Sequence, residues 1–214
     1  MGLQLAIRAH REGNLEEAEL QYRRALEQGN QEAVLFQNYG ALRRKKDPKE
    51  AEAIYLKGLA LYPSDPGILL NYSNIVRGDR PALALGFALA ALRARLRHGD
   101  SGNKQRDPWL AVLSLLRELN ASHWALAIAL DGLRWLGDDP RLLTQLLLLL
   151  SPEPNQPWQL PPVSQIDQLR DRLEGALAGA EPLLQAELLL AIAFHHLNQA
   201  ESCQALDYYE RGMG

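Results

Sequence analysis

The chain has 214 residues, a formal net charge of −3 and 47% hydrophobic residues. This length fits one elongated domain or two small ones. The near-neutral balance gives no support for a nucleic-acid partner, because such domains usually carry a strongly basic face. A single cysteine, Cys203, excludes an internal disulfide bond. The apolar residues are mainly Leu and Ala, which favour helices, so we expect an all-α protein.

The sequence shows no signal peptide at the N-terminus and no apolar run long enough to span a membrane. Arg8, His10 and Arg11 interrupt any apolar stretch near the N-terminus. The leucine run 146–150 is far too short to span a bilayer. We therefore expect a cytoplasmic protein with no membrane partner.

Helix starts can be located along the chain from their capping residues. Asn14 followed by Glu17 forms the pattern of a capping box. Four Asp-Pro pairs place a capping side chain before a proline at the first helical position. These pairs are Asp47-Pro48, Asp65-Pro66, Asp107-Pro108 and Asp139-Pro140. Together with the apolar periodicity they indicate twelve helices in six pairs.

A pattern of small and large residues recurs every 33 residues. The set Ala18, Tyr22, Ala25 and Leu26 returns as Ala51, Tyr55, Gly58 and Leu59, and again as Ala84, Ala88, Ala91 and Leu92. In the stretch 36–61, Gly40, Ala51 and Gly58 fall where two helices would cross. Tyr39 and Tyr55 would fill the space beside them. Such self-similarity indicates a repeat protein whose helix pairs stack on one another.

The spacing and the columns resemble the tetratricopeptide repeat (TPR) family. The family's small residue of the first helix is matched by Ala6, Gly40, Ser73, Ser114 and Ala193, and its alanine of the second helix by Ala18, Ala51, Ala84, Ala125 and Ala205. The resemblance covers about four-fifths of the chain. It implies a right-handed α-solenoid of about six antiparallel helix pairs.

The predicted repeats are regular in the first part of the chain and irregular after the fourth pair. Regular repeats are expected at 1–31, 32–65, 66–98 and 107–139, with an inserted polar loop between His98 and Arg106. An irregular pair is expected at 140–180, broken by the proline-rich segment 151–162, which cannot be helical. The terminal pair, 181–214, lacks a polar capping helix. We therefore expect the chain to be a fragment of a longer protein.

The first helices of stacked pairs line a concave groove in this family, and we expect that groove to bind a peptide or protein segment. Asn can pair with an extended peptide backbone, and Arg offers a fork to carboxylates. The predicted contact residues are Gln37, Asn38, Arg44, Lys45, Asn71, Asn74 and Arg77, and of these Asn38 and Asn71 are expected to be exposed. An alternative interpretation is that they are solvated polar residues on an open helix face.

Asn38 and Asn71 also form a short asparagine ladder. It resembles the repeats fused to O-linked N-acetylglucosamine transferases. Val112 and Glu118 replace the Asn and Arg in the fourth repeat. The carboxylate clamp of chaperone-binding members needs five basic or amide residues, of which this chain matches only Asn38, so we reject that function.

Two basic stretches end predicted helices. Arg43 to Lys46 end one helix, and Arg93, Arg95 and Arg97 end another. Cations at helix C-termini interact favourably with the macrodipole. An acidic partner is the alternative.

No motif points to catalysis, to a metal or to another cofactor. The adjacent His195 and His196 point about 100° apart on a helix, and Cys203 reads as a packed residue. Trp109, Trp124 and Trp135 are expected in the core of the fourth pair, and Trp158 within the proline-rich segment. We therefore expect a non-enzymatic scaffold for protein–protein interaction. The alternatives are a non-catalytic, substrate-presenting arm of a larger enzyme such as a glycosyltransferase, and a module that self-associates through its terminal repeat.

Overall fold

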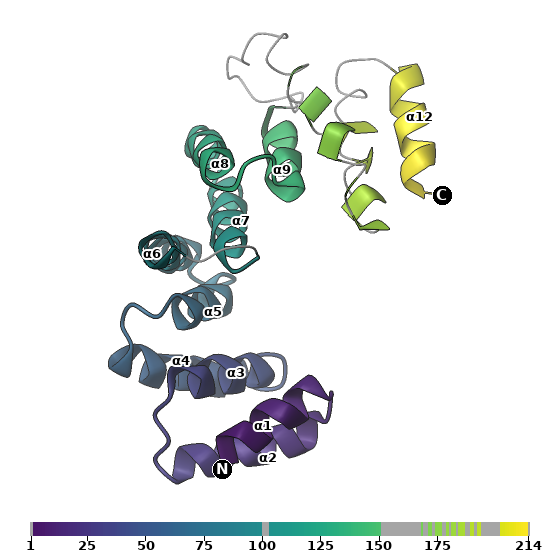
Figure 1. Ribbon diagram of the computed structural model, residues 1–214. Helices are drawn as coiled ribbons and strands as arrows, with labels where there is room; N and C mark the ends of the chain where they lie inside the picture. The colour runs from purple at the N-terminus through teal and green to yellow at the C-terminus, as the bar shows by residue number, and fades with distance from the viewer. Residues whose placement is uncertain are drawn as a thin grey trace. The chain divides into compact units, whose positions relative to one another are not determined.

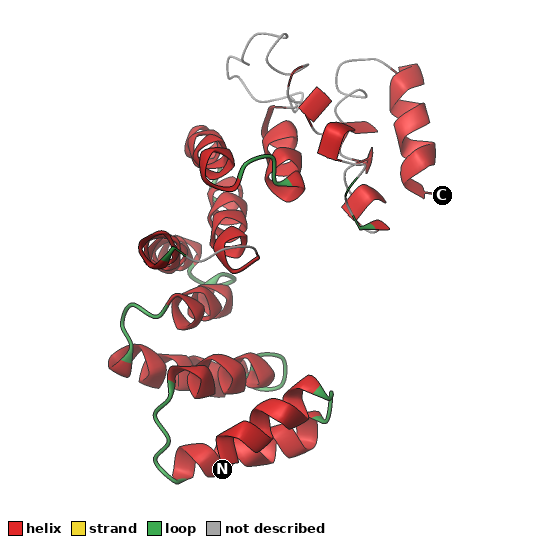
Figure 2. Ribbon diagram, in the orientation of Figure 1, coloured by secondary structure: helices red, strands yellow, loops and turns green. Residues whose placement is uncertain are grey.

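The computed structural model describes residues 2–99, 103–150, 168, 171–172, 174–176, 179, 181–182, 184–186, 189–190, 192–193 and 202–213. This part of the chain is all-α and contains no strand (Figure 2). The chain divides into two compact units, Met1–Leu119 and Asn120–Gly214. The segment 151–162, with Trp158, and the residues His195 and His196 lie outside the described residues.

The first unit is a run of helix pairs (Figure 1). Its helices are α1 (Gly2–Arg11), α2 (Leu15–Glu27), α3 (Ala33–Arg43), α4 (Pro48–Leu61), α5 (Pro66–Val76), α6 (Pro81–His98) and α7 (Asn103–Glu118). Successive helices pack as the pairs α1–α2, α3–α4 and α5–α6. Neighbouring pairs meet through α2–α3, α4–α5 and α3–α5, and α6 packs against α7. The predicted all-α fold of stacked pairs is thus confirmed.

Side chains cap these helices where the sequence predicts it. Asp47 Oδ1 accepts from the Glu50 N–H at 3.0 Å, and Asp65 Oδ1 from the Ile68 N–H at 2.8 Å. Asn14 Oδ1 accepts from the Glu17 N–H at 3.3 Å. Each such cap contributes about 1 kcal/mol to helix stability.

Small residues allow the paired helices to approach closely. A Cβ atom added at Gly40 of α3 would lie 2.4 Å from Cε1 of Tyr55 of α4, whose side chain is fully buried. In the next pair the buried Ser73 hydroxyl donates to the Ala84 carbonyl at 2.8 Å. Between pairs, the rings of Tyr22 and Tyr39 stack with their centroids 5.9 Å apart. The repeating small and large residues of the sequence therefore form the core of this unit.

The start of α7 differs from the prediction. Pro108 does not open the helix but lies inside it, because α7 begins at Asn103. The predicted polar loop from His98 to Arg106 is correspondingly shorter, since α6 runs to His98. A proline in a helix removes one backbone hydrogen bond. Here both Pro108 and Trp109 are buried, and this packing offsets the loss.

The second unit contains α8 (Ser122–Leu136), α9 (Pro140–Leu150) and α12 (Ser202–Met213). Helices α8 and α9 pack together, and their buried residues include Ala125, Ala129 and Leu133 of α8. Trp124 and Trp135 are 69% and 59% exposed, so their expected place in the core is wrong, whereas Trp109 is buried. At 100° per residue the two tryptophans share one face, roughly 120° from the buried stripe of α8.

Candidate partner-binding surface

The seven predicted contact residues come from two first helices and the turns that follow them. Gln37 and Asn38 lie on α3, and Asn71 and Asn74 on α5, while Arg44, Lys45 and Arg77 follow the ends of these helices. Arg44, Lys45 and Asn74 are exposed. The other four, Gln37, Asn38, Asn71 and Arg77, are half-buried, so the expectation that Asn38 and Asn71 are exposed is wrong.

Gln37 and Asn71 are brought together at the contact between the second and third pairs. Gln37 Nε2 donates to Asp65 Oδ1 at 2.8 Å, the same oxygen that caps α5. Asn71 Nδ2 donates to the Gln37 carbonyl at 3.4 Å. A Cβ at Gly67 would lie 2.8 Å from the Gln37 amide group, so Gln37 packs closely on the start of α5. These two side chains help to fix the register of neighbouring pairs.

Asn38 interacts with Tyr22 of the first pair. Burial raises the pKa of Tyr22, and a hydrogen bond from the Asn38 side chain partly offsets that rise. The Tyr22 hydroxyl also lies 3.2 Å from His10 Nδ1. Asn38 therefore contacts the preceding pair, as Asn71 does. Sequence reasoning identified the repeated asparagine but not this role between repeats.

Arg77 already binds a carboxylate of the same unit. Its Nε lies 2.9 Å from both Oε1 and Oε2 of Glu118, and Nη2 also contacts Glu118 and the Ser114 hydroxyl. The hydrogen bond from Arg77 lowers the pKa of Glu118, which keeps that side chain charged. The sequence showed Glu118 only as a departure from the arginine column. In the structure, the glutamate that replaces the arginine at position 118 forms an ion pair with Arg77 of the preceding repeat.

Arg43 and Lys46 of the first basic stretch also bind glutamates of the same unit. Arg43 Nη1 lies 2.7 Å from Glu19 Oε1 and Arg43 Nη2 lies 2.5 Å from Glu50 Oε2, while Lys46 Nζ lies 3.1 Å from Glu19 Oε2. Burial alone would raise the pKa of Glu19, but the Lys46 hydrogen bond and the surrounding cations outweigh it and lower the pKa. Arg44 and Lys45 form no hydrogen bond or ion pair with the described residues, so they and Asn74 are the exposed groups of the predicted surface.

The described part of the chain offers neither a metal-binding cluster nor a membrane span. There, no group of three or more His, Cys, Asp or Glu side chains is placed to hold a metal ion. Within the same residues, no helix has both the length and the apolar character needed to cross a bilayer.

Comparison with known proteins identifies the fold. No protein-family model and no curated protein matches the chain. Solved structures do: PilW, a widely conserved type IV pilus biogenesis factor, superposes with a TM-score of 0.74 at 15% identity, covering 98% of this chain and 90% of PilW. PilF of Pseudomonas aeruginosa gives 0.72 at 20% identity, covering 97% and 86%. YrrB, a TPR protein with an unusual peptide-binding site, gives 0.60 at 16% identity, covering 90% of each chain.

The chain has a TPR-like fold. Identities of 20% or less establish this fold alone, and the predicted TPR architecture is confirmed at that level. The finer resemblance to the repeats of glycosyltransferases stays a prediction.

Proposed function

We propose that this TPR-like chain is a scaffold for protein–protein interaction that binds a peptide or protein segment on the first helices of its second and third pairs. The contact residues are Gln37, Asn38, Arg44, Lys45, Asn71, Asn74 and Arg77. The observation that carries the proposal is the exposure of Arg44, Lys45 and Asn74. Beside them lie four half-buried polar residues, which form contacts between neighbouring helix pairs. A rigid surface with a few free polar groups can bind a segment without first ordering itself. YrrB, which has a similar fold, is described as having a peptide-binding site.

The exposed residues allow this proposal to be tested without disturbing the fold. A peptide is first selected from a random library on the full chain, and its affinity is measured by fluorescence anisotropy. The triple change Arg44→Ala, Lys45→Ala and Asn74→Ala should weaken binding about tenfold or more. It should leave stability nearly unchanged, because exposed sites usually shift it by less than about 0.5 kcal/mol.

A matched pair of exposed cations on second helices provides the control. Arg24 of α2 and Lys57 of α4 are exposed and form no side-chain bond with the described residues. Changing both to Ala should leave the affinity within about twofold. Equal affinity of the triple variant, or dependence on Arg24 and Lys57 instead, would contradict the proposed surface.

Self-association is a second candidate function, and the exposed face of α12 favours it. Leu206, Tyr209 and Met213 are 57%, 50% and 65% exposed, and their spacing places them on one face of the helix. A second copy could cover these apolar groups. Sedimentation at two concentrations should then show a mass that rises with concentration for the wild-type chain. The variant with serine at all three positions should remain a monomer at both concentrations.

The alternative role, a substrate-presenting arm of a glycosyltransferase, predicts a different class of peptide on the same surface. In that case the selected peptides should carry serine or threonine at a fixed position, because the presented segment must contain a hydroxyl acceptor. Selected peptides without such a position would count against this alternative and leave the scaffold proposal intact.

A further inference from the structure

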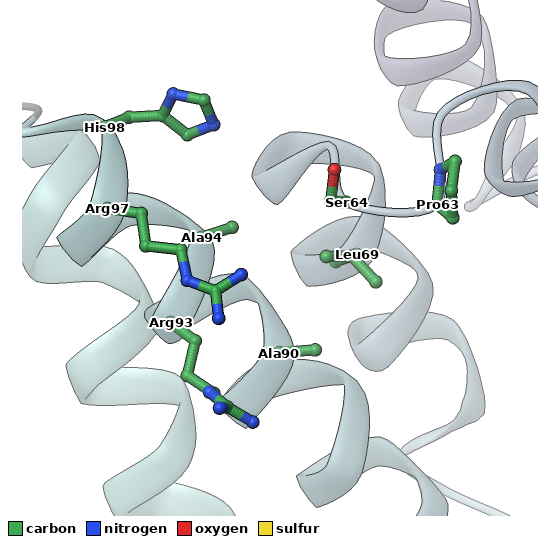
Figure 3. Close-up of a pocket in the computed structure, with 8 residues that line it drawn as sticks. All are labelled: Pro63, Ser64, Leu69, Ala90, Arg93, Ala94, Arg97 and His98. Carbon is green, nitrogen blue, oxygen red and sulfur yellow. The ribbon is translucent and has the colours of Figure 1, made fainter.

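A pocket of about 300 Å³ lies in the first unit, between the start of α5 and the second half of α6 (Figure 3). Leu69, Ala90 and Ala94 form its apolar floor, and Arg93, Arg97 and His98 stand beside them. Ligand pockets typically have volumes of about 300–1,000 Å³, so this one suits a small group or a side chain. None of the seven residues of the proposed surface lines it, and it is therefore a separate site.

The sequence of α6 builds this pocket through its spacing and its length. Arg93, Ala94, Arg97 and His98 lie three, four, seven and eight residues after Ala90, which places all five on one face of the helix. Helix α6 has 18 residues, whereas the second helices of the first two pairs have 13 and 14. The longer helix carries Arg97 and His98 beyond the apolar floor and is capped by Gly99, whose φ is 65°.

Arg93 and Arg97 of the pocket lack the glutamate partners that three other arginines of this unit have. Arg43, Arg77 and Arg80 each bind a glutamate. Arg93 and Arg97 are exposed and form no ion pair or hydrogen bond with the described residues, and none of the acidic side chains among those residues lines the pocket. The helix macrodipole stabilises a cation in the last turn by only about 0.3–1 kcal/mol. Arg93 lies before that turn, so the dipole accounts neither for Arg93 nor for the apolar floor beside it.

We propose that this pocket binds an acidic segment of a partner protein. Arginine pairs with carboxylates through two parallel hydrogen bonds. Side chains four residues apart on a helix have Cβ atoms about 5–6 Å apart. In an extended peptide, alternate residues point to the same side about 6.6 Å apart. Two alternate carboxylates therefore match Arg93 and Arg97, and an apolar side chain two residues before them can reach the floor at Leu69 and Ala90.

A protein segment fits these observations better than a nucleic acid does. Single-stranded nucleic acids bind where aromatic side chains stack on the bases, and His98 is the one aromatic side chain among the described residues that line this pocket. The net charge of −3 does not oppose an acidic peptide at close range, because charges more than about 8 Å away are largely screened at physiological salt.

The test uses the full chain and a fluorescein-labelled peptide, L-S-E-S-E, followed by fluorescence anisotropy. We expect saturable binding that weakens as salt is raised from low to physiological concentration. The double variant Arg93→Gln and Arg97→Gln should bind about tenfold more weakly, and Arg97→Gln alone about threefold. The peptide L-S-Q-S-Q should not bind, and S-S-E-S-E should bind about threefold more weakly because the floor is left empty.

A matched control shows whether the loss depends on the position of the charge. Arg24→Gln with Lys57→Gln removes the same charge from exposed positions outside both the pocket and the proposed surface and should leave L-S-E-S-E binding within about twofold. Absence of binding at millimolar protein, equal binding by the Arg93 and Arg97 variant, or equal binding of L-S-Q-S-Q would overturn the proposal. Tighter, Arg93-dependent binding of a single-stranded oligothymidine would also overturn it, in favour of a nucleic acid.

Discussion

At the scale of single residues, Gly40 and Gly86 show how position decides what a helical glycine contributes. A Cβ at Gly40 would overlap the ring of the buried Tyr55, whereas a Cβ at Gly86 would meet nothing within 4 Å. We expect Gly40→Ala to destabilise the fold by about 1–3 kcal/mol through overpacking. Gly86→Ala should stabilise it by roughly 0.5–1 kcal/mol, because alanine is the better helix former. Urea denaturation measures both, and a stable Gly40→Ala variant would contradict the close crossing of α3 and α4.

Two buried tyrosines offer a second contrast at this scale. The hydroxyl of Tyr55 is buried and has no hydrogen-bond partner among the described residues, whereas that of Tyr22 lies 3.2 Å from His10 Nδ1. Since Tyr55 loses no bond, Tyr55→Phe should leave the free energy of unfolding unchanged or slightly raised. Tyr22→Phe removes a hydrogen bond and should lower it by about 0.5–1.5 kcal/mol. Equal losses in the two variants, measured by urea denaturation, would show that the Tyr55 hydroxyl does have a partner.

At the scale of helices and their contacts, Glu19 of α2 joins the first pair to the second. Its pKa is lowered because Lys46, Arg43 and Arg23 outweigh the effect of burial. A carboxyl group with a lowered pKa stabilises the fold above its unfolded pKa of about 4.3 and loses that contribution as the pH falls through the folded value. Glu19→Gln should therefore cost about 1–2 kcal/mol at pH 7, and the difference from wild type should shrink below about pH 4.

The pH dependence can be measured as the midpoint of urea unfolding at several pH values. Glu27 of the same helix is exposed and forms no bond with the described residues, so Glu27→Gln is a matched control. This control should shift stability by less than about 0.5 kcal/mol at any pH. A Glu19→Gln deficit that persists undiminished at pH 3 would assign the loss to packing rather than to charge.

Local sequence predicts some helix starts and contacts correctly and misses others. Asp47 and Asp65 could be predicted as caps because an N-cap acts within three residues of the chain. The same Asp-Pro pattern at Asp107 failed, since burial of Pro108 and Trp109 inside a longer α7 outweighs the local signal. The link from Arg77 to Glu118 spans 41 residues. No local rule can predict it, because it depends on the register between pairs.

At the scale of the whole chain, the repeat period predicted the fold, because each helix pair buries its apolar side only by stacking on a neighbour. The same property limits what the sequence says about the site. Residues that repeat at equivalent positions can bind a partner or connect adjacent pairs, and Gln37, Asn38 and Asn71 do the latter. The boundaries of the individual repeats and the contact surface remain predictions.

The division of the chain into Met1–Leu119 and Asn120–Gly214 leads to a prediction about fragments. In stacked repeats, stability is approximately a sum of the repeats and of the interfaces between neighbours. A fragment of residues 1–119 keeps the contacts within the first unit and should fold alone, with a helical circular dichroism spectrum and a cooperative melt.

A fragment of residues 1–98 loses the α6–α7 interface and the Arg77–Glu118 ion pair. Since about 1 kcal/mol shifts the Tm of a domain of this size by roughly 4–8 °C, the shorter fragment should melt at least about 5 °C lower. An unfolded 1–119 fragment, or equal melting temperatures for the two, would show that α7 does not complete the first unit.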